Sequence, residues 1–226
     1  MSILIVTGTD TGVGKTIVTA ALALRASRLG STMVVKPTQT GMDGSEPGDA
    51  AEVTRLTGIP AQTLVELADP LAPDTAARLH GLSLPTVSEH AAAIIEQAQT
   101  HDTVIVEGAG GFLVRMDHEG HTLADLALAL PGAEVVVVTS LKLGTLNHTD
   151  LTLAALAQLG IPVRGLVIGS VPTHLDLAAE QNLLDLQRCG QPILARIPAG
   201  AGLLSREDFT ARHSSWFTAA NQQPDH

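Results

Sequence analysis

Short runs of apolar, mostly β-branched residues alternate along the chain with longer segments whose apolar positions recur at helical spacing. Most of the short runs are apolar on both faces, which is typical of parallel strands that helices cover on both sides. We predict strands over residues 3–7, 32–36, 103–107, 134–139, 163–168 and 193–196. We predict helices over residues 16–29, 48–57, 86–99, 122–130, 146–159 and 175–189, and another near 206–220.

This alternation predicts an α/β fold with a doubly wound, mainly parallel sheet of about six or seven strands flanked by helices. We expect residues 1–226 to form a single domain, with residues 221–226 as a disordered polar tail. Residues 37–102 are longer than one crossover needs. Their segments 37–48 and 69–85 are rich in Gly, Thr or Pro, so we expect loops there that build a site. Ligands of such sheets bind at the carboxyl ends of the strands.

The end of the first predicted strand carries a glycine-rich sequence, Gly8-Thr9-Asp10-Thr11-Gly12-Val13-Gly14-Lys15-Thr16, and a helical segment then begins near Ile17. Backbone N–H groups of such a turn converge on phosphate oxygens, and the helix start adds its dipole. The lysine neutralises phosphate charge, and the threonine hydroxyl is placed to ligate Mg²⁺. Counted from Gly8, the loop is one residue longer than the standard phosphate loop. A turn that is glycine-rich for packing alone would leave Lys15 unexplained, so we predict nucleotide binding.

The second predicted strand ends in Lys36-Pro37-Thr38-Gln39-Thr40-Gly41. Pro37 forces Lys36 out of helical geometry, and Thr40 follows in an irregular segment. A solvated lysine at a strand end would be unremarkable in isolation. Because Lys15 is expected on a neighbouring strand end, we predict that Lys36 binds an anion or a phosphoryl group in transfer.

The third predicted strand ends in Glu107-Gly108-Ala109-Gly110-Gly111. An acidic residue that closes an apolar strand in a nucleotide-binding sheet can ligate Mg²⁺, and the glycines after it allow close approach to the backbone. The alternative is a carboxylate that caps the next turn. Asp49 precedes a predicted helix and is either its N-cap or a third metal ligand beside Thr16 and Glu107.

Three later strand ends present mainly backbone. The segment Leu143-Gly144-Thr145-Leu146-Asn147-His148 leads into a helix whose start suits a carboxylate, although simple helix capping explains it equally well. Gly169-Ser170 and Pro198-Ala199-Gly200 are small-residue rims that can pass close to a base or ribose.

Composition excludes several function classes. A net charge of −10 and an aromatic content of 2% without tyrosine disfavour a nucleic-acid partner. Cys189 is the sole cysteine, and the histidines show no zinc-ligand spacing, so we expect neither a disulfide nor a cysteine or histidine metal site. No apolar run is long enough to span a membrane, and Met1 leads directly into a strand, so we expect a cytoplasmic protein with no membrane partner.

Taken together, the motifs over residues 7–16, 36–41, 106–111 and 144–148 resemble the dethiobiotin synthetase family over nearly the whole chain. The long phosphate loop is a feature of this family. The resemblance implies a P-loop NTPase-like fold and a reaction that depends on ATP and Mg²⁺. In that reaction 7,8-diaminononanoate and CO₂ give dethiobiotin, ADP and phosphate through a carbamate and a carbamic–phosphoric anhydride. The resemblance also implies a homodimer.

The resemblance further implies residue roles. Lys36, Lys15 and Thr11 are expected to be catalytic, and the metal is expected to bind to Thr16, Asp49 and Glu107. Residues expected to bind substrate are Thr40, Lys36, Gly111, Leu143, Gly144, Leu146 and Asn147. Residues expected to bind nucleotide are Gly12, Val13, Gly14, Lys15, Thr16, Ile17, Asp49, Glu107, Gly108, Ala109, Gly110, Gly169, Ser170, Pro198, Ala199 and Gly200.

One position departs from the family. Many members place an asparagine after the fifth predicted strand to read adenine, whereas this chain has Gly169-Ser170. We hypothesise that the backbone reads the base there, so that other nucleoside triphosphates would also serve. The alternative functions are a partitioning-type ATPase switch, a related amidation or carboxylation ligase with another substrate, and a binding module without catalysis.

Overall fold

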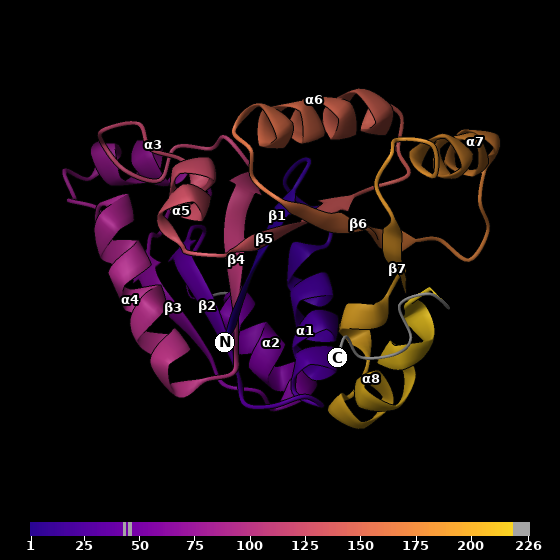
Figure 1. Ribbon diagram of the computed structural model, residues 1–226, viewed down its shortest axis with the longest axis horizontal. Coiled ribbons are helices and arrows are strands. Elements are labelled where there is room, and N and C mark those ends of the chain that lie inside the picture. The colour runs from indigo at the N-terminus through magenta and orange to yellow at the C-terminus, as the bar shows by residue number, and fades with distance from the viewer. Residues whose placement is uncertain (43, 45–46, 219–226) are drawn as a thin grey trace.

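A computed structural model describes residues 1–42, 44 and 47–218 of the chain. Its centre is a seven-stranded sheet in the order β3-β2-β4-β1-β5-β6-β7, and every strand pairing is parallel (Figure 1). The predicted doubly wound α/β fold is therefore confirmed. The strands are β1 Ser2–Gly8, β2 Thr32–Gln39, β3 Ala61–Glu66, β4 Thr103–Gly111, β5 Glu134–Thr139, β6 Val163–Val171 and β7 Ile193–Pro198.

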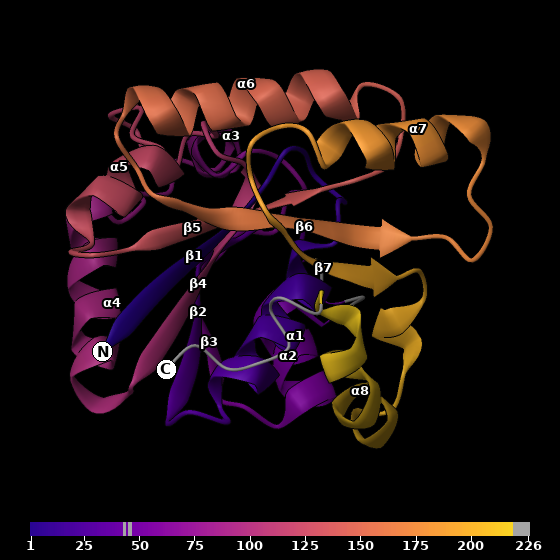
Figure 2. The ribbon, with the colours of Figure 1, turned by 45° about the vertical axis from the view of Figure 1, so that its right-hand side comes forward.

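Helices cover both faces of this sheet (Figure 2). The helices are α1 Lys15–Ala26, α2 Asp49–Thr57, α3 Pro73–Leu79, α4 Val87–Thr100, α5 Leu123–Ala129, α6 Thr145–Gln158, α7 Leu177–Leu186 and α8 Arg206–Arg212. Two short 3-10 helices follow β7 and α8, at η1 Ala201–Leu203 and η2 His213–Trp216. None of the described helices is both long and apolar enough to cross a membrane.

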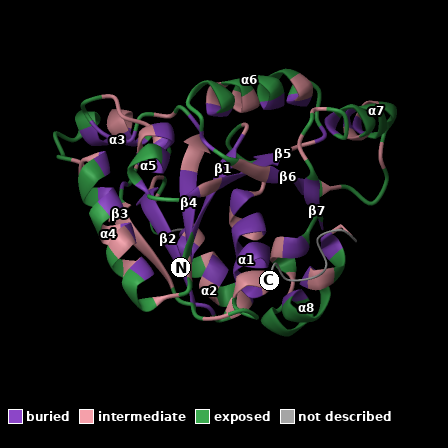
Figure 3. Ribbon diagram, viewed as in Figure 1, coloured by how far each residue is buried: buried purple, intermediate pink, exposed green. Residues whose placement is uncertain are grey.

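The strands separate two hydrophobic cores because their side chains alternate between faces. Along β1, Ile3 and Ile5 belong to the core that includes residues of α4, α5, α6 and α7, whereas Leu4 and Val6 belong to the core that includes residues of α1, α2 and α8. Strands β1, β2 and β5 are almost entirely buried, while the outer faces of α6 and α7 are exposed (Figure 3). This double coverage explains why the central strands are apolar on both faces.

Two elements were missed in the sequence, and both lie in the long segment between the second and third predicted strands. Strand β3 pairs with β2 at the edge of the sheet, and its residues are half-buried rather than buried. Its mixture of polar and apolar residues therefore lacks the continuous apolar run used to predict the other strands. Helix α3 has only seven residues and begins at Pro73, within the segment that we expected to be a loop.

Other differences concern boundaries. Strand β4 continues through Gly111, so the predicted glycine loop is the end of the strand itself. The first predicted helix ends at Ala26, three residues before 29, in a turn that precedes Gly30. The helix predicted near 206–220 is α8 followed by η2, and residues 219–220 of that prediction lie outside the described residues. The tail predicted over 221–226, and residues 43 and 45–46 of the predicted 37–48 loop, also lie outside them.

Candidate functional site

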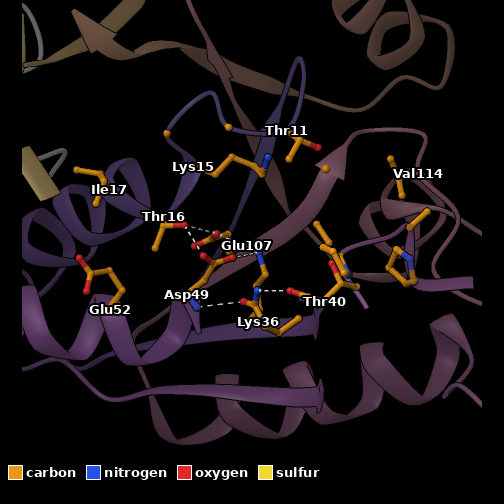
Figure 4. Close-up of a pocket in the computed structure, with 18 of the residues that line it drawn as sticks. Thr11, Lys15, Thr16, Ile17, Lys36, Thr40, Asp49, Glu52, Glu107 and Val114 are labelled. Atoms are coloured by element: carbon orange, nitrogen blue, oxygen red, sulfur yellow. Dashed lines mark hydrogen bonds and ion pairs between the residues drawn. The ribbon is translucent and has the colours of Figure 1, made fainter. Parts of the chain in front are cut away.

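A cavity of about 1070 Å³ opens at the carboxyl ends of β1, β2 and β4 (Figure 4). The sheet order makes these strands neighbours although they are far apart in the sequence. Predicted site residues that line the cavity are Thr11, Gly12, Gly14, Lys15, Thr16, Ile17, Lys36, Thr40, Asp49, Glu107, Ala109 and Gly110. The structure thus brings the phosphate loop, the second lysine and the three predicted metal ligands to one site.

The phosphate loop turns sharply into α1. Gly14, the N-cap of α1, has a φ of 96°, a left-handed conformation that favours glycine. Lys15 is the first residue of the helix, and its ammonium donates a hydrogen bond to the carbonyl oxygen of Asp10 at 3.1 Å. The loop therefore folds over the lysine side chain and leaves backbone N–H groups at the helix start for an anion.

Lys36 and two carboxylates form the centre of the site. The Lys36 side chain is 3% exposed, and its ammonium lies 2.6 Å from Asp49 Oδ2 and 3.0 Å from Glu107 Oε1. It also donates to the carbonyl oxygen of Gly108 at 3.0 Å. Glu107 is 1% exposed, so the buried lysine and the buried glutamate compensate each other's charge.

Burial and neighbouring charges shift the pKa values of these groups in different directions. Burial raises the pKa of Glu107, and the Lys36 ammonium opposes that rise. Burial also acts to raise the pKa of Asp49, but Lys36 outweighs it and holds this pKa below its usual value. The pKa of Lys36 is raised because Glu107 and Asp49 outweigh the effect of burial. Burial and the neighbouring Lys36 lower the pKa of Lys15. Two cations thus face the same cavity, an arrangement that an anionic ligand would stabilise.

Three oxygen atoms beside Lys36 have the spacing of metal ligands. Thr16 Oγ1 lies 2.8 Å from Asp49 Oδ1 and 3.0 Å from Glu107 Oε1. Neighbouring ligands of an octahedral Mg²⁺ ion, each about 2.1 Å from the metal, lie about 3 Å apart. A hydroxyl and two carboxylates are the hard oxygen donors that Mg²⁺ prefers. These three residues therefore fit a magnesium ion by both spacing and chemistry.

Local structure holds the metal-site carboxylates in place. Asp49 is the first residue of α2, and its backbone N–H donates to the side-chain oxygen of Gln39 at the end of β2. The Gln39 amide nitrogen in turn donates to the carbonyl oxygen of Thr40. Glu107 is fixed within β4. The predicted N-cap role of Asp49 is therefore wrong, because Gly48 is the N-cap and Asp49 faces the cavity.

Several predicted residues lie outside the lining of this cavity in the described part of the chain. Val13, within the phosphate loop, has a buried side chain. The others are Gly108 and Gly111 in β4, Leu143 and Gly144 just before α6, Leu146 and Asn147 in its first turn, Gly169 and Ser170 in β6, Pro198 at the end of β7, and Ala199 and Gly200 after it.

Gly169 has a structural role that its sequence position did not reveal. A Cβ at Gly169 would lie 1.9 Å from the carbonyl oxygen of Val13, and one at Gly14 would lie 2.6 Å from the carbonyl oxygen of Gly169. The end of β6 is therefore packed directly against the phosphate loop, and a side chain at Gly169 would displace that loop.

The structure also adds residues to the site. Six further lining residues lie in the segments 37–48 and 69–85 that we expected to build a site, namely Gln39, Pro47, Pro70, Leu71, Ala72 and Pro73. The lining residues that the sequence did not indicate are Glu52, Val114 and Leu203. Glu52 lies one helical turn after Asp49 and could have been found from that spacing. Ile17 and Glu52 lie on one side of the carboxylate cluster, whereas Thr11, Thr40 and Val114 lie on the other (Figure 4). The cavity thus has two ends with the charged cluster between them.

Comparisons with known proteins agree with this geometry. A family model described as an AAA domain matches residues 2–205. The ATP-dependent dethiobiotin synthetase of Rhodococcus jostii is 51% identical over 222 residues, which cover 96% of this chain and 95% of that protein. The ATP-dependent dethiobiotin synthetase of Streptomyces coelicolor is 51% identical over 221 residues, which cover 96% of this chain and 92% of that protein.

Solved structures with this fold include ATPases of cell division and partitioning. The cell division ATPase MinD of Pyrococcus furiosus matches 94% of this chain and 89% of its own, with a TM-score of 0.53 and 17% identity. A ParA family ATPase of Chlorobium tepidum matches 93% of this chain and 90% of its own, with a TM-score of 0.54 and 13% identity. At these identities the likeness concerns the fold alone.

Proposed function

Because this chain belongs to the dethiobiotin synthetase family, we propose that the cavity at the ends of β1, β2 and β4 holds ATP and 7,8-diaminononanoate together. The enzyme is an ATP-dependent ligase of biotin biosynthesis that closes a cyclic urea from the diamine and CO₂. The partitioning-type switch loses its support, since its resemblance is confined to the fold.

The observation that carries the proposal is the convergence of two lysines and three metal-type ligands in one cavity. A carbamate, a triphosphate and a phosphoryl group in transfer are all anionic, so bringing them together requires compensating positive charge. Lys15 follows β1 and Lys36 lies in β2, and both supply part of that charge. The expectation that these strands are neighbours is wrong, because β4 lies between them, but both strand ends face the same cavity. A binding module without catalysis would have no use for a buried Lys36.

We assign the metal to Thr16, Asp49 and Glu107. Asp49 Oδ1 and Glu107 Oε1 both lie within 3.0 Å of Thr16 Oγ1. When bound, Mg²⁺ offsets the negative charge of the phosphate oxygens during transfer. The phosphates of ATP bind to backbone N–H groups of Gly12, Val13 and Gly14, and Lys15 contacts the β- and γ-phosphates. Val13 contributes its backbone here, which fits its buried side chain.

The substrate end of the cavity then lies beyond the γ-phosphate, toward Thr11, Thr40 and Gly110. One amine of the diamine takes up CO₂ as a carbamate, and a carbamate oxygen attacks the γ-phosphorus while ADP leaves with the electrons of the broken P–O bond. The second amine attacks the carbamate carbon, phosphate departs with the C–O electrons, and the amine proton passes to solvent. Lys36 stabilises the carbamate and the transferred phosphoryl group, and the Thr11 and Thr40 hydroxyls orient them.

The reaction is tested by incubating the protein with diaminononanoate, bicarbonate, Mg²⁺ and ATP and searching for the cyclic urea by mass spectrometry. We expect one ADP and one phosphate for each dethiobiotin, with little phosphate release when either the diamine or bicarbonate is omitted. The matched control is Lys36→Met, which retains the length of the side chain without its charge. Phosphate release that is independent of the diamine would contradict the proposal and would favour an ATPase switch.

Gly169-Ser170 stands where the resemblance implies an asparagine that reads adenine in many family members. We propose that backbone groups of Ser170 and of Pro198, Ala199 and Gly200 read the base, so that CTP also supports turnover. Their position at the ends of β6 and β7 supports this assignment, because β6 contacts the phosphate loop at Gly169. Comparable turnover with CTP and ATP is the expected result, and strict dependence on ATP would refute it.

We also propose a homodimer in which the start of α6 contributes to the substrate site of a second copy. Leu143, just before α6, is 85% exposed, and Leu151 on α6 is also exposed, although both are apolar. Leu143 and Asn147 lie away from the cavity of their own chain, which supports a role across an interface. Light scattering should give twice the mass of one chain, and Leu143→Asp should shift the protein toward the monomer.

A further inference from the structure

The Lys36 ammonium contacts the same carboxylates that the proposed metal site needs. It lies 2.6 Å from Asp49 Oδ2 and 3.0 Å from Glu107 Oε1. The second of these atoms is also 3.0 Å from Thr16 Oγ1, so one oxygen serves both the lysine and the proposed ligand set. A divalent ion bound to Asp49 and Glu107 would therefore lie next to the ammonium.

Charge makes joint occupancy of these carboxylates unfavourable. The ammonium and the metal ion would repel each other at short distance, in a site where Lys36 is 3% and Glu107 1% exposed and solvent screens little. Without either cation, the buried Glu107 carboxylate would lie uncompensated near the half-buried Asp49 carboxylate, which is also costly. The two carboxylates therefore need one compensating cation, either the Lys36 ammonium or the metal ion, but not both at once.

Lys36 has an alternative position available. Its side chain has four rotatable bonds, and the cavity continues beside it toward Thr40. The Gly108 carbonyl, 3.0 Å from the ammonium, belongs to β4 and is not one of the proposed metal ligands, so it remains as a partner if the carboxylates are lost. Lys15 differs, because its ammonium donates to the Asp10 carbonyl and forms no hydrogen bond with these carboxylates among the described contacts.

We propose that Lys36 is an exchangeable counterion of the metal site. It neutralises Asp49 and Glu107 until the metal–nucleotide complex arrives, and metal binding then releases its ammonium toward the carbamate side of the cavity. This inference rests on the proposed assignment of the metal to Thr16, Asp49 and Glu107. The proposal therefore fixes the order of two steps: the metal binds first, and only then does the Lys36 ammonium become available to the carbamate.

A binding experiment separates the exchange from the metal assignment. Mn²⁺ is titrated by electron paramagnetic resonance in the presence of ADP, which lacks the γ-phosphate that Lys36 is proposed to contact. We expect Lys36→Met to bind Mn²⁺ at least tenfold more tightly than the wild type, because the competing cation is removed. Asp49→Asn should bind Mn²⁺ at least tenfold more weakly. Arg188→Met, which removes an exposed cation on α7's C-terminal side, should leave the affinity unchanged.

The outcomes of these two variants are distinguishable. If Asp49→Asn weakens Mn²⁺ binding but Lys36→Met does not tighten it, the exchange is wrong and the metal site stands. If Asp49→Asn has no effect, the metal assignment itself is wrong, and the exchange falls with it.

A second measurement on the wild type covers the case in which Lys36→Met does not fold. The lysines of the sequence are Lys15, Lys36 and Lys142, so a sample with ¹³C-labelled lysine gives few signals, and Lys142→Arg and Lys15→Arg assign the rest by elimination. We expect ADP alone to leave the Lys36 ε-methylene signal near its starting position. Addition of Mg²⁺ should move it to a new position with narrower lines, because the ammonium leaves its buried ion pair. An unchanged signal at saturating Mg²⁺ would overturn the proposal.

Discussion

The two halves of the carboxyl edge of the sheet present different chemistry. The ends of β1, β2 and β4 deliver charged side chains, and Lys36, Asp49 and Glu107 contact one another there through buried ion pairs. The ends of β5, β6 and β7 deliver glycines, backbone and exposed leucines, with Leu203 91% exposed at the cavity. The first half provides charge for chemistry, whereas the second provides surfaces and close backbone contacts.

The difference shows which kind of substitution each half should tolerate. In the charged half, removal of one group leaves a buried partner uncompensated, so the effects of single substitutions are large. In the other half, specificity comes from shape and backbone position, so only substitutions that move the backbone should matter strongly. The predictions below are ordered by expected effect and test this contrast.

The largest effect is expected for Lys36→Met. Loss of a cation that stabilises the transferred phosphoryl group should lower kcat by about 10²–10³-fold, whereas the affinity for nucleotide should change little. Steady-state kinetics and equilibrium binding of ADP measure the two quantities separately. An unchanged kcat would remove Lys36 from the mechanism.

Glu107→Gln should act through the metal. The amide preserves the shape of the side chain but weakens both the proposed metal bond and the ion pair with Lys36. We expect the Mg²⁺ concentration for half-maximal rate to rise by at least about tenfold, together with a lower kcat. A normal Mg²⁺ titration would show that Glu107 is not a ligand.

Gly169→Ala tests the half of the edge that depends on backbone contacts. Its Cβ would meet the Val13 carbonyl oxygen at 1.9 Å and Val138 Cγ1 at 2.7 Å, so the phosphate loop must shift. We expect a loss of unfolding free energy of at least about 2 kcal/mol and weaker nucleotide binding. The matched control is Gly111→Ala, whose Cβ would lie 3.7 Å from the carbonyl oxygen of Gly8, an ordinary contact. Equal stability of the two variants would contradict the close packing at Gly169.

Ser170→Asn should sharpen base selection without changing the chemistry. An amide side chain adds hydrogen-bonding groups at the proposed base-reading edge, so the preference for ATP over CTP should rise by about tenfold in kcat/KM. Competition experiments with both nucleotides measure this ratio directly. A ratio equal to that of the wild type would place the base elsewhere.

The smallest effect concerns stability away from the site. His90 on α4 is 1% exposed, its Nε2 has no partner among the described residues, and burial lowers its pKa below the ordinary 6.5. Between the lowered pKa and 6.5 the unfolded chain binds more protons than the folded one, so stability falls as the pH drops below 6.5. His90→Leu should flatten part of this loss in urea unfolding between about pH 7.5 and about pH 5.5. Burial lowers the pKa of His213 in the same way, so part of the dependence of stability on pH should remain in the His90→Leu variant.

The contrast between the two halves also explains what the sequence could predict. The phosphate loop, Lys36 and Glu107 were recognised because charged residues at the ends of apolar strands are rare without a function. Strand β3 was missed because an edge strand is half-buried and lacks a continuous apolar run. Leu203 was missed because its place in the cavity depends on which face of η1 points inward, whereas Glu52 could have been found from its helical spacing to Asp49. The packing of Gly169 on the phosphate loop depends on tertiary contact between β6 and α1 and has no local signal.

Transfer of labelled oxygen tests most directly the claim that the two cations hold a carbamate against the γ-phosphate. The enzyme is mixed briefly with diaminononanoate, Mg²⁺, ATP and freshly dissolved ¹⁸O-labelled bicarbonate. The masses of the released phosphate and of the cyclic urea are then measured by mass spectrometry. If a carbamate oxygen attacks the γ-phosphorus, each phosphate released carries one ¹⁸O atom and each cyclic urea retains one. Unlabelled phosphate would mean that water attacks ATP, and the account of the site would then be wrong.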